Sequence, residues 1–198
     1  MRFVTAAAAS AFLSVMAMGL TSPALAQDEA VAAASAAGEP TDAELAQFAA
    51  AMAKVRAVAA QVQDGAPSAE QQAEMAGAVQ NSGLAIERFN AISAAVSNDE
   101  VLQARVAVAS ETPSAEGSVG AGVTDAEAGQ FAKAMGDITG IAQALNGAAP
   151  DADQQAQMAS AITNSGLTIE RFNEISQATG SDDHLRARIG LAQARAGQ

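Results

Sequence analysis

The sequence predicts an all-α protein made of two copies of one small helical unit. Residues 41–109 align with residues 124–192 at a constant offset of 83, with no insertion or deletion. Roughly half of the aligned positions are identical, which indicates an internal duplication. Apolar residues recur three and four positions apart, as on one face of a helix, whereas the alternation typical of strands is missing. We therefore expect two tandem units of about four helices each.

The first helix of each unit is predicted to begin at a capping box. Thr41 and Thr124 are each followed three residues later by a glutamate, Glu44 or Glu127, that can reach back to the threonine backbone. An apolar stripe follows each box and predicts one long amphipathic helix. Its residues are Leu45, Phe48, Met52, Val55, Ala59 and Val62 in the first unit, and Ala128, Phe131, Met135, Ile138, Ala142 and Leu145 in the second.

Prolines and glycines mark the limits of the second helix. Pro67 and Pro150 precede it, and Gly83 and Gly166 are placed to end it, because glycine readily takes the left-handed conformation that closes a helix. A leucine after each glycine can fold back onto the helix. The expected caps and box partners of this helix are Ser68 with Gln71 and Asp151 with Gln154.

Two further helices complete each unit. The third carries the apolar residues Ile86, Phe89 and Ile92, or Ile169, Phe172 and Ile175. The fourth is predicted to begin after Asn98 or Ser181, with acidic residues in its first turn and arginines later, a polarity that suits the helix dipole. A unit of about 69 residues is near the lower limit for an independent core, so we expect the units to pack on each other with pseudo-symmetry or on another chain.

The N-terminal segment has the features of a signal peptide. A positive start at Arg2 is followed by an apolar run, and the small-x-small pattern at residues 24–26 predicts cleavage between Ala26 and Gln27. The expected organisation is a signal peptide (1–26), a disordered lead-in (27–40), helical repeat 1 (41–109), a linker (110–123), helical repeat 2 (124–192) and a tail (193–198). We therefore expect a periplasmic or secreted protein with no membrane insertion after cleavage.

Composition restricts the function classes. Loss of Arg2 takes the net charge from −12 to −13, which argues against binding nucleic acid or anionic lipid, since both need a basic counter-surface. The chain has no cysteine, so it can have neither a disulfide framework nor a lipid attached to cysteine.

Several shared motifs resemble a known family. Both copies contain Thr-Asp-Ala-Glu followed by Phe, then Gly-Leu-x-Ile-Glu-Arg-Phe-Asn-x-Ile, then Asp-x-x-Leu-x-x-Arg. In these motifs the chain resembles the bacterial domain of unknown function 4168 family, found in exported proteins, over about 70% of its length. The resemblance implies a small helical envelope domain with no established activity, substrate or cofactor. The chain departs from the family in its alanine content and in carrying two copies.

The duplication helps to test candidate catalytic and metal-binding residues, because a residue needed for a shared role should occur in both copies. The single histidine, His184, aligns with Val101, so the shared role of the two units cannot need an imidazole for nucleophilic catalysis. The acidic clusters at residues 182–184 and 151–153 lose their potential metal ligands in the other copy, and helix capping explains both. We expect neither a catalytic residue nor a metal or other cofactor, so the protein is predicted not to be an enzyme.

A small set of polar residues is shared by the copies without an obvious role in the core. These candidates for an interaction surface are Glu87, Arg88 and Asn90 in the first unit, and Glu170, Arg171 and Asn173 in the second. One alternative is structural: the asparagine amide caps the loop after Pro67 or Pro150.

Three functions remain open at this point. The leading hypothesis is a non-enzymatic protein-interaction or structural module that binds an envelope protein or self-associates. The second is a periplasmic chaperone or stress-buffering protein that uses methionine-bearing helical surfaces. The third is a hydrolase acting through Glu87 and Glu170.

Overall fold

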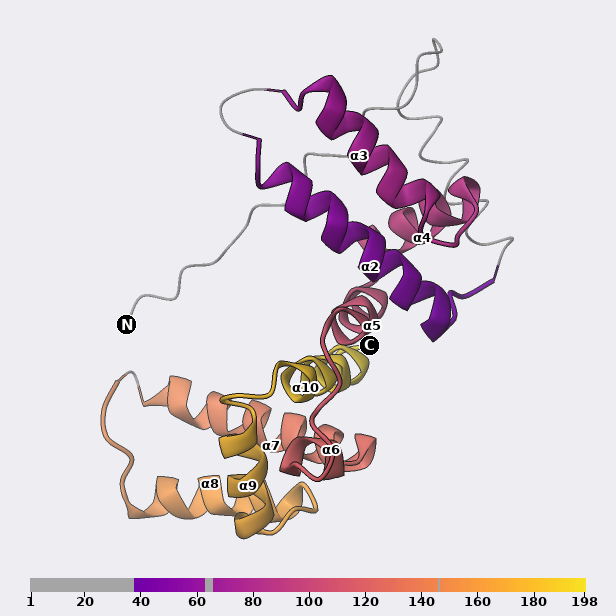
Figure 1. Cartoon of the computed structure of the whole chain (residues 1–198). Helices are drawn as coiled ribbons and strands as arrows, with labels where there is room; N and C mark the ends of the chain where they lie inside the picture. Colours follow the sequence, from indigo (N-terminus) through magenta and orange to yellow (C-terminus); the bar gives the residue numbers. More distant parts are fainter. Residues whose placement is uncertain (1–37, 63–65, 146) are drawn as a thin grey trace.

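The computed structural model describes residues 38–62, 66–145 and 147–198. The predicted signal peptide and most of the predicted lead-in lie outside these residues. All regular structure in the described part is helical, arranged as two groups of helices (Figure 1). The prediction of an all-α fold with two tandem units is confirmed.

Each group contains four helices in equivalent places, and a short helix lies between the groups. The first repeat has α2 (Asp42–Ala59), α3 (Ala69–Gln80), α4 (Ile86–Asn98) and α5 (Glu100–Ser110). The second has α7 (Asp125–Ala144), α8 (Ala152–Asn164), α9 (Ile169–Ala178) and α10 (Asp183–Ala196). The short helix α6 (Val119–Gly122) lies in the segment expected to be a linker.

The predicted capping boxes are present on the first two helices of both repeats. Thr41 and Ser68 cap α2 and α3, and Thr124 and Asp151 cap α7 and α8, each with its side-chain partner three residues later. Each box satisfies two backbone N–H groups that a helix start leaves unpaired. The last helices were predicted to begin directly after Asn98 and Ser181. They begin one residue later, because Asp99 and Asp182 serve as their N-caps. These helix starts are therefore encoded locally.

A pair of phenylalanine rings joins the first and third helices of each repeat. The ring centroids of Phe48 and Phe89 are 4.8 Å apart, and those of Phe131 and Phe172 are also 4.8 Å apart. Aromatic pairs at this separation stabilise a core beyond the area that they bury. Each pair belongs to a separate hydrophobic cluster, so each repeat has its own core.

The predicted apolar stripe is too long at its C-terminal end. Leu45 and Phe48 are buried, and so are their equivalents, but Ala59 and Ala142 are exposed. The last turns of α2 and α7 extend beyond the third and fourth helices and have only α3 or α8 beside them (Figure 1). Burial in the last turn of α2 falls instead on Val58, which is 4% exposed and lies outside the predicted stripe.

The core of each repeat also includes the residue immediately before the first capping box. Pro40 is buried together with Leu45, and Val123 is buried together with Ala128. A buried residue before the N-cap that pairs with the fourth residue of the helix is the arrangement of a hydrophobic staple. Val123 of the predicted linker thus packs in the core of the second repeat, and Pro40 of the predicted lead-in is likewise buried.

The two repeats meet through their last helices. Helix α5 contacts α2 of its own repeat and also α10, and α10 contacts α7 as well as α5. Figure 1 shows α5 and α10 side by side at the centre, with the remaining helices of each repeat on either side. Equivalent helices therefore form the junction, as expected for pseudo-symmetric units.

The glycines after the second helices are required by their backbone conformation. Gly166 has a φ of +99°, in the left-handed region, and Gly83 has a φ of +86°. We expect Gly166→Ala to lower the free energy of unfolding by about 1–2 kcal/mol, because a Cβ is disfavoured there. The added Cβ would also lie 2.6 Å from Nε2 of Gln130, which must move. Chemical denaturation followed by circular dichroism measures the change.

Gly136 provides the matched control. It lies within α7, is exposed, and a Cβ there would meet no other atom within 4 Å. Gly136→Ala should stabilise the protein by up to about 1 kcal/mol, since alanine is the better helix former. Equal effects of the two substitutions would contradict the role assigned to Gly166.

Candidate interaction surface

The six candidate residues lie in the first two turns of α4 and α9, and the structure divides them into two sets. Glu87 and Asn90 are exposed, as are their equivalents Glu170 and Asn173. The two arginines are mostly buried, with 16% and 26% of their side-chain surface exposed. Only the glutamates and asparagines are therefore fully available to a partner.

Each arginine reaches across to the first helix of its own repeat. Nε of Arg88 donates to Oε1 of Glu44 at 2.7 Å, and Nη2 donates to Oε2 at 3.0 Å. Nε of Arg171 donates to Oε1 of Glu127, again at 2.7 Å. The glutamates next to these arginines in the chain, Glu87 and Glu170, are not their partners. Adjacent residues on a helix point in different directions, whereas Glu44 and Glu127 lie directly opposite.

The glutamates that receive these arginines also complete the capping boxes. Oε2 of Glu44 accepts hydrogen bonds from the backbone N and Oγ1 of Thr41, both at 2.9 Å. Oε2 of Glu127 accepts from the same two atoms of Thr124, at 2.8 and 3.0 Å. One carboxylate per repeat therefore fixes a helix start and joins α2 to α4, or α7 to α9.

These contacts favour the ionised carboxylates. The hydrogen bond from Arg88 and then that from the Thr41 backbone lower the pKa of Glu44 from 4.5 to about 2. The hydrogen bonds from Arg171 and the Thr124 backbone have the same effect on Glu127, whose pKa is also about 2. Donors that contact the charged form of a carboxyl group stabilise that form.

A second arginine joins the last helix of each repeat to the same place. Nη2 of Arg105 lies 2.7 Å from Oδ1 of Asp42, and Nη2 of Arg188 lies 2.5 Å from Oδ1 of Asp125. The hydrogen bond from Arg188 lowers the pKa of Asp125. These pairs were not predicted from the sequence, although the aspartate and the arginine are each shared by the two copies. The presence of the same aspartate and the same arginine in both copies could have indicated these ion pairs.

The asparagines do not have the structural role considered for them. The carbonyl oxygens of Pro67 and Pro150 accept hydrogen bonds from Gln72 and Gln155, at 2.8 and 3.0 Å. Glutamines on the second helix thus cap these loops. Within the described residues, the side chains of Asn90 and Asn173 form no hydrogen bond, which leaves their amides free at the surface.

An exposed isoleucine accompanies each exposed glutamate and asparagine. Ile86 is 50% exposed, and its equivalent Ile169 is 42% exposed. We call residues Ile86, Glu87 and Asn90, with Ile169, Glu170 and Asn173, the paired surface. The prediction that both isoleucines belong to the apolar face of the third helix was wrong: each is the first residue of its helix and is exposed, while the phenylalanine and isoleucine further along the helix are buried.

The lone histidine lies in a small polar cluster at the linker. Oγ of Ser114 lies 3.0 Å from Oδ1 of Asp182 and 3.4 Å from Nδ1 of His184. The serine thus donates to the aspartate, which also caps α10 by accepting from the backbone N of Leu185. A serine nucleophile needs a base placed to remove its proton, and here the proton points to the N-cap carboxylate. The cluster joins the linker to the second repeat.

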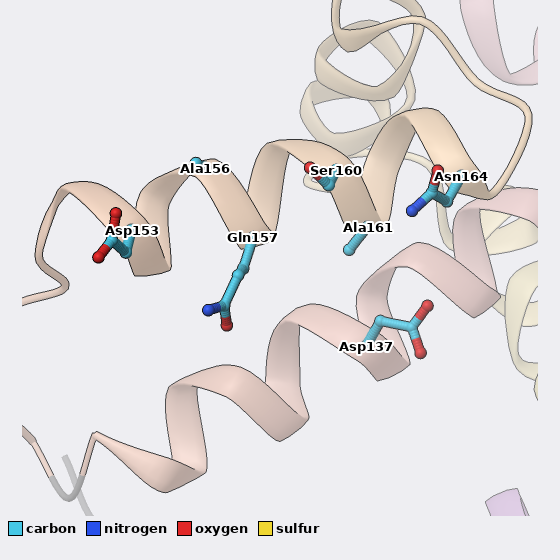
Figure 2. Close-up of a pocket in the computed structure, with 7 residues that line it drawn as sticks. All are labelled: Asp137, Asp153, Ala156, Gln157, Ser160, Ala161 and Asn164. Carbon is cyan, nitrogen blue, oxygen red and sulfur yellow. The ribbon is translucent and has the colours of Figure 1, made fainter.

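A shallow, open groove of about 580 Å³ lies between α7 and α8. Figure 2 shows Gln157 and Ala161 of α8 pointing toward α7, which contributes Asp137. Nζ of Lys133 lies 2.9 Å from this aspartate. The position of Asp137 is Lys54 in the first repeat, so the charge of the groove is not shared. Among the described residues, no group of three or more His, Asp or Glu is placed to hold a metal ion.

The comparisons with known proteins agree with the duplication. The family model described as Domain of unknown function (DUF4168) matches residues 66–106 and again residues 148–189. The prediction that the chain resembles this family in two tandem copies is confirmed. The matched segments contain the second and third helices of each repeat and the first part of the fourth, with the arginines, but not the first helices that pair with them. Searches of curated proteins and of solved structures found no match.

In the part of the chain that the structure describes, no helix combines the length and the apolar character needed to span a membrane.

The ion pairs predict how stability depends on pH. The pKa values of Glu44 and Glu127 are about 2 in the folded protein, below the ordinary value of 4.5. Their contribution is therefore complete above about pH 4.5 and is lost as the pH falls toward 2, because the unfolded chain binds the protons more tightly. We expect the melting temperature to fall steeply in this range, as measured by circular dichroism at a series of pH values.

The double variant Glu44→Gln, Glu127→Gln is the control for this assignment. Glutamine already serves as the box partner at Gln71 and Gln154, so the caps remain while the charge is removed. At pH 7 the variant should lose about 0.5–1 kcal/mol of unfolding free energy per repeat. Its melting temperature should also fall less between pH 5 and pH 2.5. An unchanged acid profile would show that other carboxylates cause the loss.

Proposed function

We propose that this protein is an exported, non-enzymatic helical module that binds a partner protein in the cell envelope. The signal-peptide features of the N-terminal segment and the resemblance to a family found in exported proteins support export. The periplasm or the extracellular medium is the proposed location. The paired surface is the proposed binding face.

The exposed isoleucines are the observation that carries this proposal. Ile86 and Ile169 occupy equivalent positions and expose about half of their surface, although isoleucine is among the residues most often buried. A single exposed apolar residue needs no explanation, but here the same residue is exposed twice beside the same glutamate and asparagine. An apolar centre with polar neighbours is the usual composition of a small protein-binding surface.

The methionines favour this proposal over the chaperone alternative. Met52 and Met135 pack against the two hydrophobic cores, and Met75 and Met158 are half-buried. A surface that holds varied unfolded chains needs its flexible thioethers exposed. The positions of these four side chains are better explained by core filling.

The carboxylates give little support to the hydrolase alternative. Glycoside hydrolysis uses two carboxyl groups on either side of the scissile bond, one of them in an apolar environment that keeps it protonated. Glu87 and Glu170 are exposed, and they belong to different repeats. The exposed positions of Glu87 and Glu170 suit surface recognition better.

Site-specific crosslinking tests the proposed binding face. A photoreactive amino acid is placed at Asn90 or at Asn173, both exposed, and the protein is irradiated in intact cells. We expect both positions to capture the same partner. Replacing Ile86 and Ile169 with glutamate should reduce the capture while leaving the melting temperature unchanged, because a glutamate in the first turn of a helix is well tolerated.

Gln103 is the control position for crosslinking, since it is exposed on α5. Equal capture from Gln103, or capture that the isoleucine substitutions leave intact, would contradict the proposal. Capture of many unfolded proteins would instead favour the chaperone function. Loss of a hydrolytic activity in the double variant Glu87→Gln, Glu170→Gln would favour the hydrolase.

Cleavage of the predicted signal peptide can be tested directly. Mass spectrometry of the protein from its native cells should show Gln27 as the first residue, and Ala26→Leu should block this cleavage because the site requires a small residue. A mature chain that keeps residues 1–26 would contradict the proposed processing.

A further inference from the structure

The last helix of each repeat carries a second row of half-buried residues besides its core-facing row. On α5, the face toward its own core carries Leu102, Val106 and Ala109, and on α10 it carries Leu185, Ile189 and Ala192. A second row on each helix is half-buried although it points away from this core: Val101, Ala104 and Val108 on α5, and His184, Ala187 and Leu191 on α10. Spacings of three and four place each row on one helical face.

These second rows form the junction between the repeats. Helices α5 and α10 contact each other (Figure 1), and each second row is rotated by about 130° from the core-facing row of its helix. The remaining side of α5, with Gln103, Ala107 and Ser110, is exposed. The second rows lie on the side of each helix that is left for the opposite repeat, and His184 also contacts Ser114 of the linker.

The two rows are equivalent in sequence as well as in place. Each residue of the α5 row lies 83 positions before its counterpart in the α10 row. A contact between equivalent surfaces is isologous: a surface that fits its counterpart once can do so again in a second chain. Alanine at the centre of both rows, Ala104 and Ala187, leaves the backbones room to approach.

The connection that keeps this contact within one chain is short. The Ser114 hydroxyl is bonded to Asp182, and the carbonyl oxygen of Gly122 accepts from Nη2 of Arg171 at 3.3 Å. The linker from Ser114 onward is thus held by the second repeat. Only residues 111–113 remain between α5 and this attachment, and all three are exposed. They can span at most about 11 Å.

We propose that the α5–α10 contact is a self-complementary interface that a second copy of this chain can also occupy, giving a reciprocal dimer in which α5 of each chain packs on α10 of the other. Residues 111–113 act as the hinge that selects between the closed monomer and this dimer. The effective concentration across a short linker is in the millimolar range, so the closed form dominates at micromolar concentrations. A shortened hinge prevents α5 from reaching α10 of its own chain. The contact then forms between two chains, as in domain swapping.

Hinge variants test this proposal. Deleting Glu111 and Thr112 should double the mass measured by light scattering at micromolar concentration, with the helical content unchanged. Replacing the same two residues with Gly-Ser keeps the length and should leave a monomer. Leu191→Glu added to the deletion should restore the monomer, whereas Gln103→Glu on the exposed side should not. A deletion variant that stays monomeric with native helicity, or a dimer that survives Leu191→Glu, would overturn the proposal.

A second measurement uses the natural hinge, in case the deletion prevents folding. Two differently tagged copies of the unaltered protein are unfolded and refolded together at about 1 mM, where exchange between chains competes with closure. We expect the tags to co-purify, and Leu191→Glu to reduce co-purification at least tenfold. Absence of co-purification, or an equal loss with Gln103→Glu, would overturn the proposal.

Discussion

The carboxylate three residues into the first helix of each repeat is the contact on which the rest of the unit depends. Glu44 and Glu127 close the capping box that starts the helix, and they also receive the arginine from the third helix. A charge-assisted hydrogen bond in each repeat, doubled to a fork between Arg88 and Glu44, helps to set the rotation of the third helix as well as its distance. That rotation turns the phenylalanine inward and the isoleucine outward.

The composition of the exposed surface follows from this orientation. Because Arg88 and Arg171 are used within their repeats, the start of α4 and α9 presents an isoleucine, a glutamate and an asparagine to solvent. The arginines of α5 and α10 are held in the same way by Asp42 and Asp125. Four of the protein's few cations thus contribute to the folding of the repeats, and the free charge at the proposed binding face is negative.

The duplication has two structural consequences. It presents one surface twice, which gives a partner two equivalent sites, and it places the last helix of one repeat against the last helix of the other. A helix with one apolar face can complete only its own core, whereas α5 and α10 each carry a second apolar row. Two marginal cores can therefore support each other through a contact that the repeats make symmetrically.

The sequence by itself determined the helices, the duplication and most helix ends, because caps, glycine stops and apolar spacing act between residues a few positions apart. It also placed Phe48 and Phe131 in the core. Only the tertiary structure decided the rest. The partners of Arg88 and Arg171 lie 44 residues away in the chain. The exposure of Ile86 and Ile169 depends on how α4 and α9 are rotated. The second row of α5 can be recognised as a contact surface only because α10 lies beside it. Such contacts depend on where whole helices lie, which local patterns do not specify.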